Sequence, residues 1–141
     1  MLLILHAAVT WALFGLIATI QLVHYPLFSR VGEAGWETYE REHQNRITWL
    51  VAPLMLAELL SAAYLALSPP PGLPVWSLWL GLALVLGIWA STGLVQSPLH
   101  GRLSARFDAR LHRRLVGSNW ARTVAWTLRG GLCVWWLYLY L

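Results

Sequence analysis

Histidine is the residue of this sequence best suited to chemistry near neutral pH, because imidazole can accept a proton or bind a metal ion. Four of the five histidines lie beside the ends of apolar segments, at positions expected on one face of a membrane. They are His24, His43, His100 and His112. Only His6 is expected near the other face. A shared site and four separate structural histidines are the two alternatives.

Other polar side chains accompany these histidines, and they are too many for helix ends that meet only lipid. Two of them are arginines, whose guanidinium groups suit carboxylates, phosphates and enolate-like oxygens. Together with the histidines they predict a polar pocket that opens from the cytoplasmic side of the membrane. These residues are Gln21, Tyr25, Glu40, Arg46, Gln96, Asn119 and Arg122.

Two charged residues are expected deeper in the membrane. Counting from the cytoplasmic ends of their segments, Glu58 and Arg129 both lie about 15 to 17 Å into the bilayer. A charge at mid-bilayer costs at least ~2.5 to 3.5 kcal/mol, so mutual pairing inside the bundle is expected. Two roles remain open for this pair: it orients helices, or it supplies a counter-charge at the floor of the pocket.

Metal binding is the main alternative for the histidines. Glu40 and His43 have the Glu-x-x-His spacing of di-iron bundles, but such bundles need the motif twice and two further glutamates. The second half offers only Asp108 and His112, four residues apart. We therefore predict a site without a cofactor, and as the alternative a mononuclear metal site. Its ligands would be His24, His43, His100 and His112.

The elements that position these residues are expected to be membrane-spanning helices. The chain has 141 residues, of which 58% are hydrophobic and only 11% charged, which is far from the mix of a soluble domain. Four apolar segments are long enough to cross about 30 Å of hydrocarbon. We predict one all-α domain, a polytopic membrane four-helix bundle. Its spans cover roughly residues 2–25, 47–67, 75–95 and 119–141.

The distribution of arginine sets the expected orientation in the membrane. The basic residues are all arginine, and nearly all lie in or beside the connections 29–46 and 96–118, with none on the other face. By the positive-inside rule, both connections are cytoplasmic and both termini lie outside the inner (plasma) membrane. Pro26 is expected to end the first helix at the cytoplasmic interface.

Both cytoplasmic connections are expected to form short interfacial helices. In "GRLSARFDARLHRRL" an apolar residue recurs every four positions, and arginines fill the rest of the helical wheel. Such a helix lies on the membrane with its arginines at anionic lipid head groups, and nucleic acid is not an expected partner. The shorter "GWETYEREHQNR" is expected to lead into the second span.

The two halves of the chain resemble one another. "YPLFSRV" at 25–31 matches "SPLHGRL" at 97–103 at a shift of 72 residues, and "NRITW" at 45–49 is echoed by "NWARTVAW" at 119–126. Because each half would cross the membrane twice, the two halves are expected to form a parallel repeat.

The same motifs carry a resemblance to a known family. The series "HYPLFSRVG", "YEREHQNRITWLVAP", "PLHGRL" and "NWARTVAW" resembles a bacterial family of small four-helix integral membrane proteins related to fungal anthrone oxygenases. In that family the second span opens with an asparagine and leads to a proline, here Asn45 and Pro53. The fourth opens with Asn-x-x-Arg-Thr, here Asn119, Arg122 and Thr123. The sequence departs from the pattern in its "HY" before Pro26 and in its short outer loop.

The resemblance implies oxygenation of a lipophilic phenolic or anthrone-like compound without flavin or haem. In such chemistry a base removes an acidic C–H proton, and the resulting carbanion reacts directly with oxygen. The resemblance implies His24 or His43 as the base, with Arg46 or Arg122 beside the phenolate or enolate oxygen. The expected partners are the lipid bilayer and a hydrophobic small molecule. The predicted ligand-binding residues are Gln21, Tyr25, Glu40, His100, Asn119, Glu58 and Arg129.

Two functions of other classes remain as alternatives. In the first, the pocket binds or transports an ion, a proton or a lipid without catalysis. In the second, the chain is a small structural subunit of an oligomer or a larger membrane complex, with its ten tryptophans as packing surface. Ordered polar side chains around a cavity favour a site, whereas a dry apolar centre favours a structural subunit.

Overall fold

Four long helical segments make up the computed structural model, which describes residues 1–140 and has no strand among them. The first segment is α1 (Leu2–Thr19), followed by a π-helical turn η1 (Ile20–His24), α2 (Tyr25–Leu27) and a 3-10 turn η2 (Phe28–Arg30). The second is α3 (Glu33–Leu67). The third is α4 (Val75–Ser91), followed by a π-helical turn η3 (Thr92–Gln96) and α5 (Ser97–Leu103). The fourth is α6 (Ala109–Tyr140).

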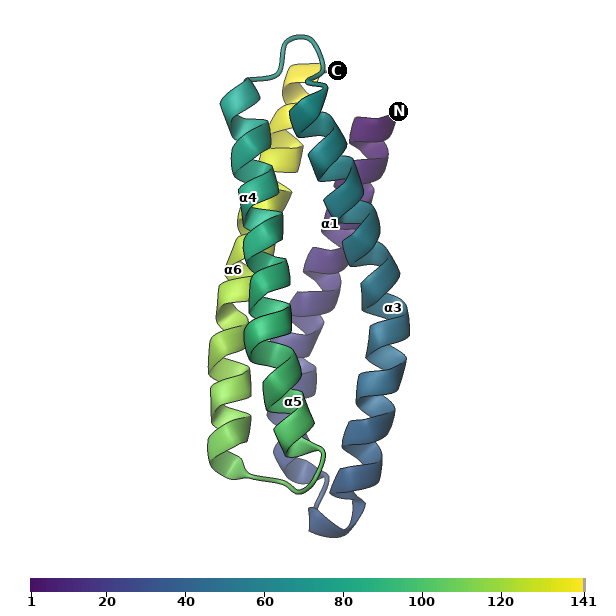
Figure 1. Cartoon of the computed structure of the whole chain (residues 1–141), viewed down its shortest axis with the longest axis vertical. Helices are drawn as coiled ribbons and strands as arrows, with labels where there is room; N and C mark the ends of the chain where they lie inside the picture. Colours follow the sequence, from purple (N-terminus) through teal and green to yellow (C-terminus); the bar gives the residue numbers. More distant parts are fainter. Residues whose placement is uncertain (141) are drawn as a thin grey trace.

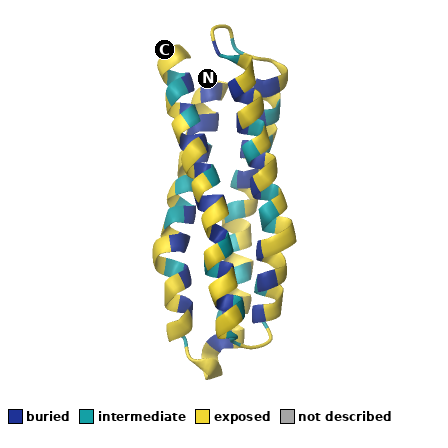
Figure 2. Cartoon of the chain, turned by 90° about the vertical axis from the view of Figure 1, so that its left-hand side faces the viewer, coloured by how far each residue is buried: buried dark blue, intermediate teal, exposed yellow. Residues whose placement is uncertain are grey.

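The segments form an up-and-down bundle (Figure 1). Helices α1 and α4 each pack against α3 and α6, so α3 and α6 face each other across the diagonal. The two termini and the loop 68–74 lie at one end of the bundle, and the loop 104–108 lies at the other. The buried residues form stripes that face inward along the whole length, and exposed residues cover the outside (Figure 2). The predicted all-α four-helix bundle is confirmed.

Three of the four segments are long and apolar enough to cross a membrane. They are Leu2–Arg30, Glu33–Leu67 and Val75–Leu103. The fourth predicted span, 119–141, falls within α6, where Arg122 and Arg129 interrupt the apolar stretch; Leu141 lies outside the described residues. The chain therefore has the character of a membrane protein, while the fourth crossing stays a prediction.

Pro26 does not end the first segment, contrary to the prediction from sequence. The chain remains helical through Pro26 to Arg30, and a π-helical turn lies directly before the proline-containing stretch. Proline removes one backbone donor, and a local π adjustment can accommodate this loss without ending the helix. The same arrangement recurs at Pro98, which follows η3.

These proline sites give the predicted repeat a structural counterpart. The two π-helical turns begin at residues 20 and 92, a shift of 72, and the segments that carry them run in the same direction (Figure 1). The shared residues extend beyond the matched motif, since "LV" precedes both sites, and each motif contains an arginine at the same position. The matching pairs are Leu22 and Leu94, Val23 and Val95, Pro26 and Pro98, Leu27 and Leu99, and Arg30 and Arg102.

The predicted interfacial helix over 101–115 is broken in two. Helix α5 ends at Leu103, and α6 begins at Ala109. The carboxylate of Asp108 accepts the backbone N–H groups of Arg110 at 2.7 Å and Leu111 at 2.9 Å, which caps the start of α6 and lowers the pKa of Asp108. "GWETYEREHQNR" is likewise not a separate helix, because it belongs to the uninterrupted α3.

The apolar residues of these connections close the end of the bundle instead of lying on the membrane. Leu103 and Leu115 are fully buried in one cluster with Phe28 and Trp36. The indole N–H of Trp36 donates to the backbone carbonyl of Leu103 at 2.6 Å, which ties α3 to α5. The packed end holds the polar side chains of the neighbouring helices in fixed positions.

Candidate functional site

Three side chains from three segments, the buried Tyr25 and Glu40 and the partly buried His100, form a hydrogen-bonded chain. The hydroxyl of Tyr25 lies 2.9 Å from Nε2 of His100, and Nδ1 of His100 lies 2.5 Å from Oε1 of Glu40. A carboxylate can only accept, so His100 donates through Nδ1, and its Nε2 accepts the proton of the Tyr25 hydroxyl. This carboxylate–imidazole–phenol relay, called the Tyr25 relay below, has the form in which an imidazole activates a hydroxyl group.

The fold fixes the Tyr25 relay from both sides. Tyr25 follows the π-helical turn η1, and His100 lies on α5 after η3. Glu40 and Gln44 are one turn apart on α3, and the amide of Gln44 donates to Oε1 of Glu40 at 3.3 Å and to Oγ of Ser104 at 2.6 Å. The two π-helical turns and α3 thus converge on the same point, and the carboxylate orients the imidazole.

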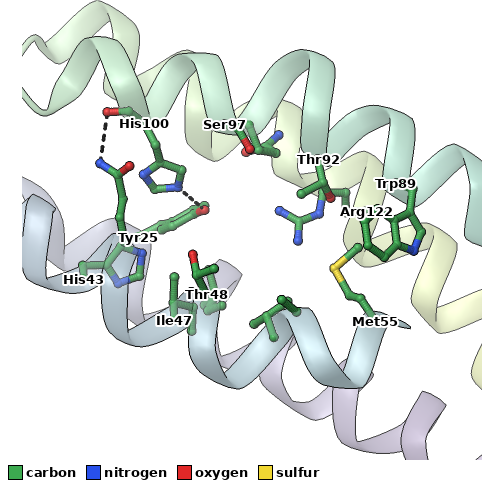
Figure 3. Close-up of a pocket in the computed structure, with 15 residues that line it drawn as sticks. Tyr25, His43, Ile47, Thr48, Met55, Trp89, Thr92, Ser97, His100 and Arg122 are labelled. Atoms are coloured by element: carbon green, nitrogen blue, oxygen red, sulfur yellow. Dashed lines mark hydrogen bonds between the residues drawn. The ribbon is translucent and has the colours of Figure 1, made fainter. Parts of the chain in front are cut away.

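The Tyr25 hydroxyl points into a cavity of about 240 Å³ between the helices, called the main cavity below (Figure 3). Its apolar wall comes mainly from α3, with Ile47, Val51 and Met55. The guanidinium of Arg122 enters it from α6 (Figure 3). The other polar lining residues are His43, Gln44, Thr48, Trp89, Thr92, Gln96, Ser97 and His100.

Arg122 is a buried cation without an anion. It is 7% exposed, and within the described residues it forms no ion pair. Its protein contacts are one hydrogen bond from NH1 to Oδ1 of Asn119 at 3.3 Å and a position 5.3 Å over the ring of Trp126. Asn119 is held in turn by Gln21, whose Oε1 accepts its amide at 2.8 Å. A buried charge is costly unless it is paired, so this site is suited to an anionic ligand.

Several atoms around the main cavity have no hydrogen-bond partner in the described part of the chain. They include Nε of Arg122, Nε1 of Trp89 and Oε1 of Gln96, and Gln96 is only 2% exposed. Buried polar atoms are usually paired, and a group of unpaired ones is a mark of a binding site. The main cavity is therefore lined by three residues, Arg122, Trp89 and Gln96, whose polar groups the protein does not fully satisfy.

The predicted catalytic residues fall into two groups. His43 and Arg122 line the main cavity. His24 does not line it, but its Nε2 lies 2.9 Å from Nδ1 of His43. Arg46 does not reach this cavity. It lies on the exposed face of α3 and contacts Glu42 one turn away at 3.5 Å, because the inner face of this helix carries Glu40 and Gln44 instead.

The expected ion pair between Glu58 and Arg129 is present, with Nε of Arg129 at 2.8 Å from Oε1 of Glu58. It joins α3 and α6 across the diagonal of the bundle. The pair does not line the main cavity. Both side chains form hydrogen bonds with other residues of the bundle. Glu58 also accepts from Thr10 at 3.0 Å and Trp126 at 3.0 Å. Their contacts favour the helix-orienting role over the role of a ligand-binding counter-charge.

His6 belongs to this deep polar cluster, and sequence reasoning missed it. Its Nε2 lies 3.0 Å from NH2 of Arg129, which can only donate, so His6 donates through Nδ1 to Oγ of Ser61 at 2.6 Å. Arg129 also donates to the carbonyl of Gly81. The spacing of His6 and Thr10, one turn apart on α1, is the one sequence signal for a polar inner face there.

The histidines proposed as metal ligands have different partners. Nε2 of His112 lies 2.8 Å from the backbone carbonyl of Tyr25, and His100 belongs to the Tyr25 relay. Residues 1–140 contain no group of three or more His, Cys, Asp or Glu side chains placed to hold a metal ion. A shared site would require His112 to leave the carbonyl, and the metal alternative stays a prediction without a formed ligand set.

Comparisons with protein-family models, with curated proteins and with solved structures find no match. The resemblance to the relatives of anthrone oxygenases therefore depends on the quoted motifs alone.

Proposed function

We propose that the chain is an integral membrane enzyme that binds a lipophilic phenolic or anthrone-like compound in the main cavity and oxygenates it without a cofactor. One observation carries this proposal: the Tyr25 relay and the unpaired guanidinium of Arg122 meet at the same cavity. The first can remove a proton, and the second can bind the oxygen on which negative charge develops.

The chemistry follows from the arrangement of these groups. Transfer of the Tyr25 proton to Nε2 of His100 gives a phenolate, and Glu40 stabilises the imidazolium that forms. The phenolate takes a proton from the acidic CH2 group of the substrate, while Arg122 binds the enolate oxygen. The carbanion then reacts with dioxygen. Overall, one CH2 group and one O2 give one carbonyl group and one water.

His43 is the second group that could accept the substrate proton. It faces the main cavity, and its Nδ1 lies beside Nε2 of His24. If His43 donates through Nδ1 to His24, its own Nε2 is left as a free base. Replacement of Tyr25 or His43 separates the two routes, because the Tyr25 relay does not pass through His43.

Anthrone is the probe for the activity. We expect purified protein to consume one O2 per anthrone and to form the quinone faster than the spontaneous reaction, followed with an oxygen electrode and by absorbance. The control is Ala52→Phe, which places a large side chain at the wall of the main cavity from a position that is itself exposed. Turnover by this variant at the wild-type rate would contradict the proposal, and anthrone binding without oxygen uptake would leave a binding module.

The membrane orientation is proposed from the arginines. We infer that the end of the bundle with the loop 104–108 lies in the cytoplasm and that both termini lie outside the inner membrane. Cysteines introduced at the exposed Pro69 and Ala105 report this orientation, because the native Cys133 is buried. We expect an impermeant maleimide to label Pro69→Cys in intact cells and Ala105→Cys only after lysis. The opposite labelling pattern would reverse the orientation.

A further inference from the structure

A second cavity, here called the arginine groove, lies on the outside of the bundle between α5 and α6. Its volume is about 450 Å³. Arg102 of α5 and Arg114 of α6 line it from opposite sides, and both are exposed. It shares no lining residue with the main cavity. A ligand here would therefore be distinct from the proposed substrate.

The wall of the arginine groove changes from charged to apolar along the bundle axis. Leu94, Val95 and Pro98 precede Arg102 on the same helical segment, and Leu94 is 78% exposed. In a membrane, exposed leucine and valine side chains meet acyl chains, whereas arginines beside them reach the head groups. The groove thus has an apolar part followed by a cationic part, which matches the acyl chain and the anionic head group of an amphiphile.

Neither arginine of the groove is neutralised by the protein. In the part of the chain that the structure describes, Arg102 and Arg114 form no ion pair. Arg46, in the pocket between η1 and α3, is different because it contacts Glu42 at 3.5 Å. The arginine groove therefore presents two positive charges that no carboxylate of the described residues neutralises.

We propose that the arginine groove binds one anionic phospholipid, with its phosphate group between Arg102 and Arg114 and an acyl chain along Leu94 and Val95. Basic pockets between membrane helices bind such head groups, and two guanidinium groups favour a lipid with net negative charge over a zwitterionic one. Gly117 forms part of the wall without a side chain, and a Cβ atom there would meet no other atom within 4 Å. The open space at this glycine leaves room for the head group.

Native mass spectrometry of the full chain in mild detergent tests the site, with phosphatidylglycerol and phosphatidylcholine added in equal amounts. We expect wild-type protein to retain phosphatidylglycerol in preference. The double variant Arg102→Gln, Arg114→Gln is expected to bind it about 25-fold more weakly, from a factor of roughly 5 for each basic residue. The matched control Arg110→Gln, Arg113→Gln removes the same charge from exposed positions of α6 that do not line the groove.

Gly117→Leu provides an independent test that leaves every charge in place. Leucine is the better helix former, so the substitution does not weaken α6, but its side chain occupies the groove. We expect this variant to lose phosphatidylglycerol selectively. The site would be overturned by equal retention of the two lipids, by equal losses in the two double variants, or by wild-type retention in Gly117→Leu.

Discussion

Replacing Glu58 with glutamine is expected to lower the free energy of unfolding by about 3 to 5 kcal/mol, because it leaves Arg129 as a buried unpaired charge. Both side chains are fully buried, and Nε of Arg129 lies 2.8 Å from the carboxylate. The carboxylate of Glu58 accepts hydrogen bonds from Trp126 and Thr10. A glutamine has only one acceptor oxygen, so its NH2 group would face one of these two donors. Loss of the charge and loss of an acceptor act in the same direction.

A double-mutant cycle separates the pair from its surroundings. Glu58→Gln, Arg129→Met and the combined variant are compared by their unfolding free energies in detergent. We expect the combined loss to be much smaller than the sum, since removal of both charges leaves neither unpaired. Glu37→Gln is the control, because Glu37 forms an exposed pair with Arg41 at 3.5 Å and its loss should change stability little. Simple addition of the two single losses would show that the residues are not partners.

The depth of this pair could be predicted from sequence, but its surroundings could not. Helical rise alone puts Glu58 and Arg129 at matching depth. The rotation of α1 about its axis depends on packing against α3 and α6, and this rotation decides whether His6 faces lipid or Arg129. The same limitation applies to Arg46, because the sequence gives its distance along α3 and not the side of the helix that meets the main cavity.

Two errors in the predicted elements have different physical causes. The break at 104–108 had a sequence signal, because aspartate is a preferred N-cap and Asp108 stands directly before "ARLHRRL". The apolar residue at every fourth position of 101–115 predicts one continuous helix, and this pattern is stronger than a single N-cap residue. The continuation of the helix through Pro26 had no comparable signal, since proline usually ends a helix and a π-helical turn has no reliable sequence pattern.

The repeat explains why equivalent elements carry different chemistry. At a shift of 72 residues, Tyr25 corresponds to Ser97 and Phe28 to His100. The hydrogen bond between Tyr25 and His100 therefore joins two positions that are not equivalent. The corresponding positions hold Phe28, which is buried in the apolar cluster, and Ser97, which lines the main cavity. The repeated helices therefore form the Tyr25 relay once, because the equivalent positions of the other half lack the tyrosine and the histidine.

Replacing Arg122 with methionine is expected to abolish most of the proposed activity and yet to stabilise the ligand-free protein. We expect anthrone turnover to fall about 10² to 10³-fold, the usual effect of removing a group that stabilises a developing oxyanion. Stability should rise by about 1 to 3 kcal/mol, because a buried donor with no partner is removed. Opposite changes in activity and stability are typical of a residue retained for function.

Arg129→Met is the matched control for this prediction. The two arginines lie on the same face of α6, two turns apart, and both are buried. They differ in their partners, since Arg129 contacts Glu58, His6 and Gly81, whereas Arg122 has one long hydrogen bond to Asn119. The same substitution should therefore change the free energy of unfolding in opposite directions, as measured by thermal or chemical unfolding in detergent. Equal destabilisation by both substitutions would mean that Arg122 is already satisfied within the fold, and the main cavity would then not need an anionic ligand.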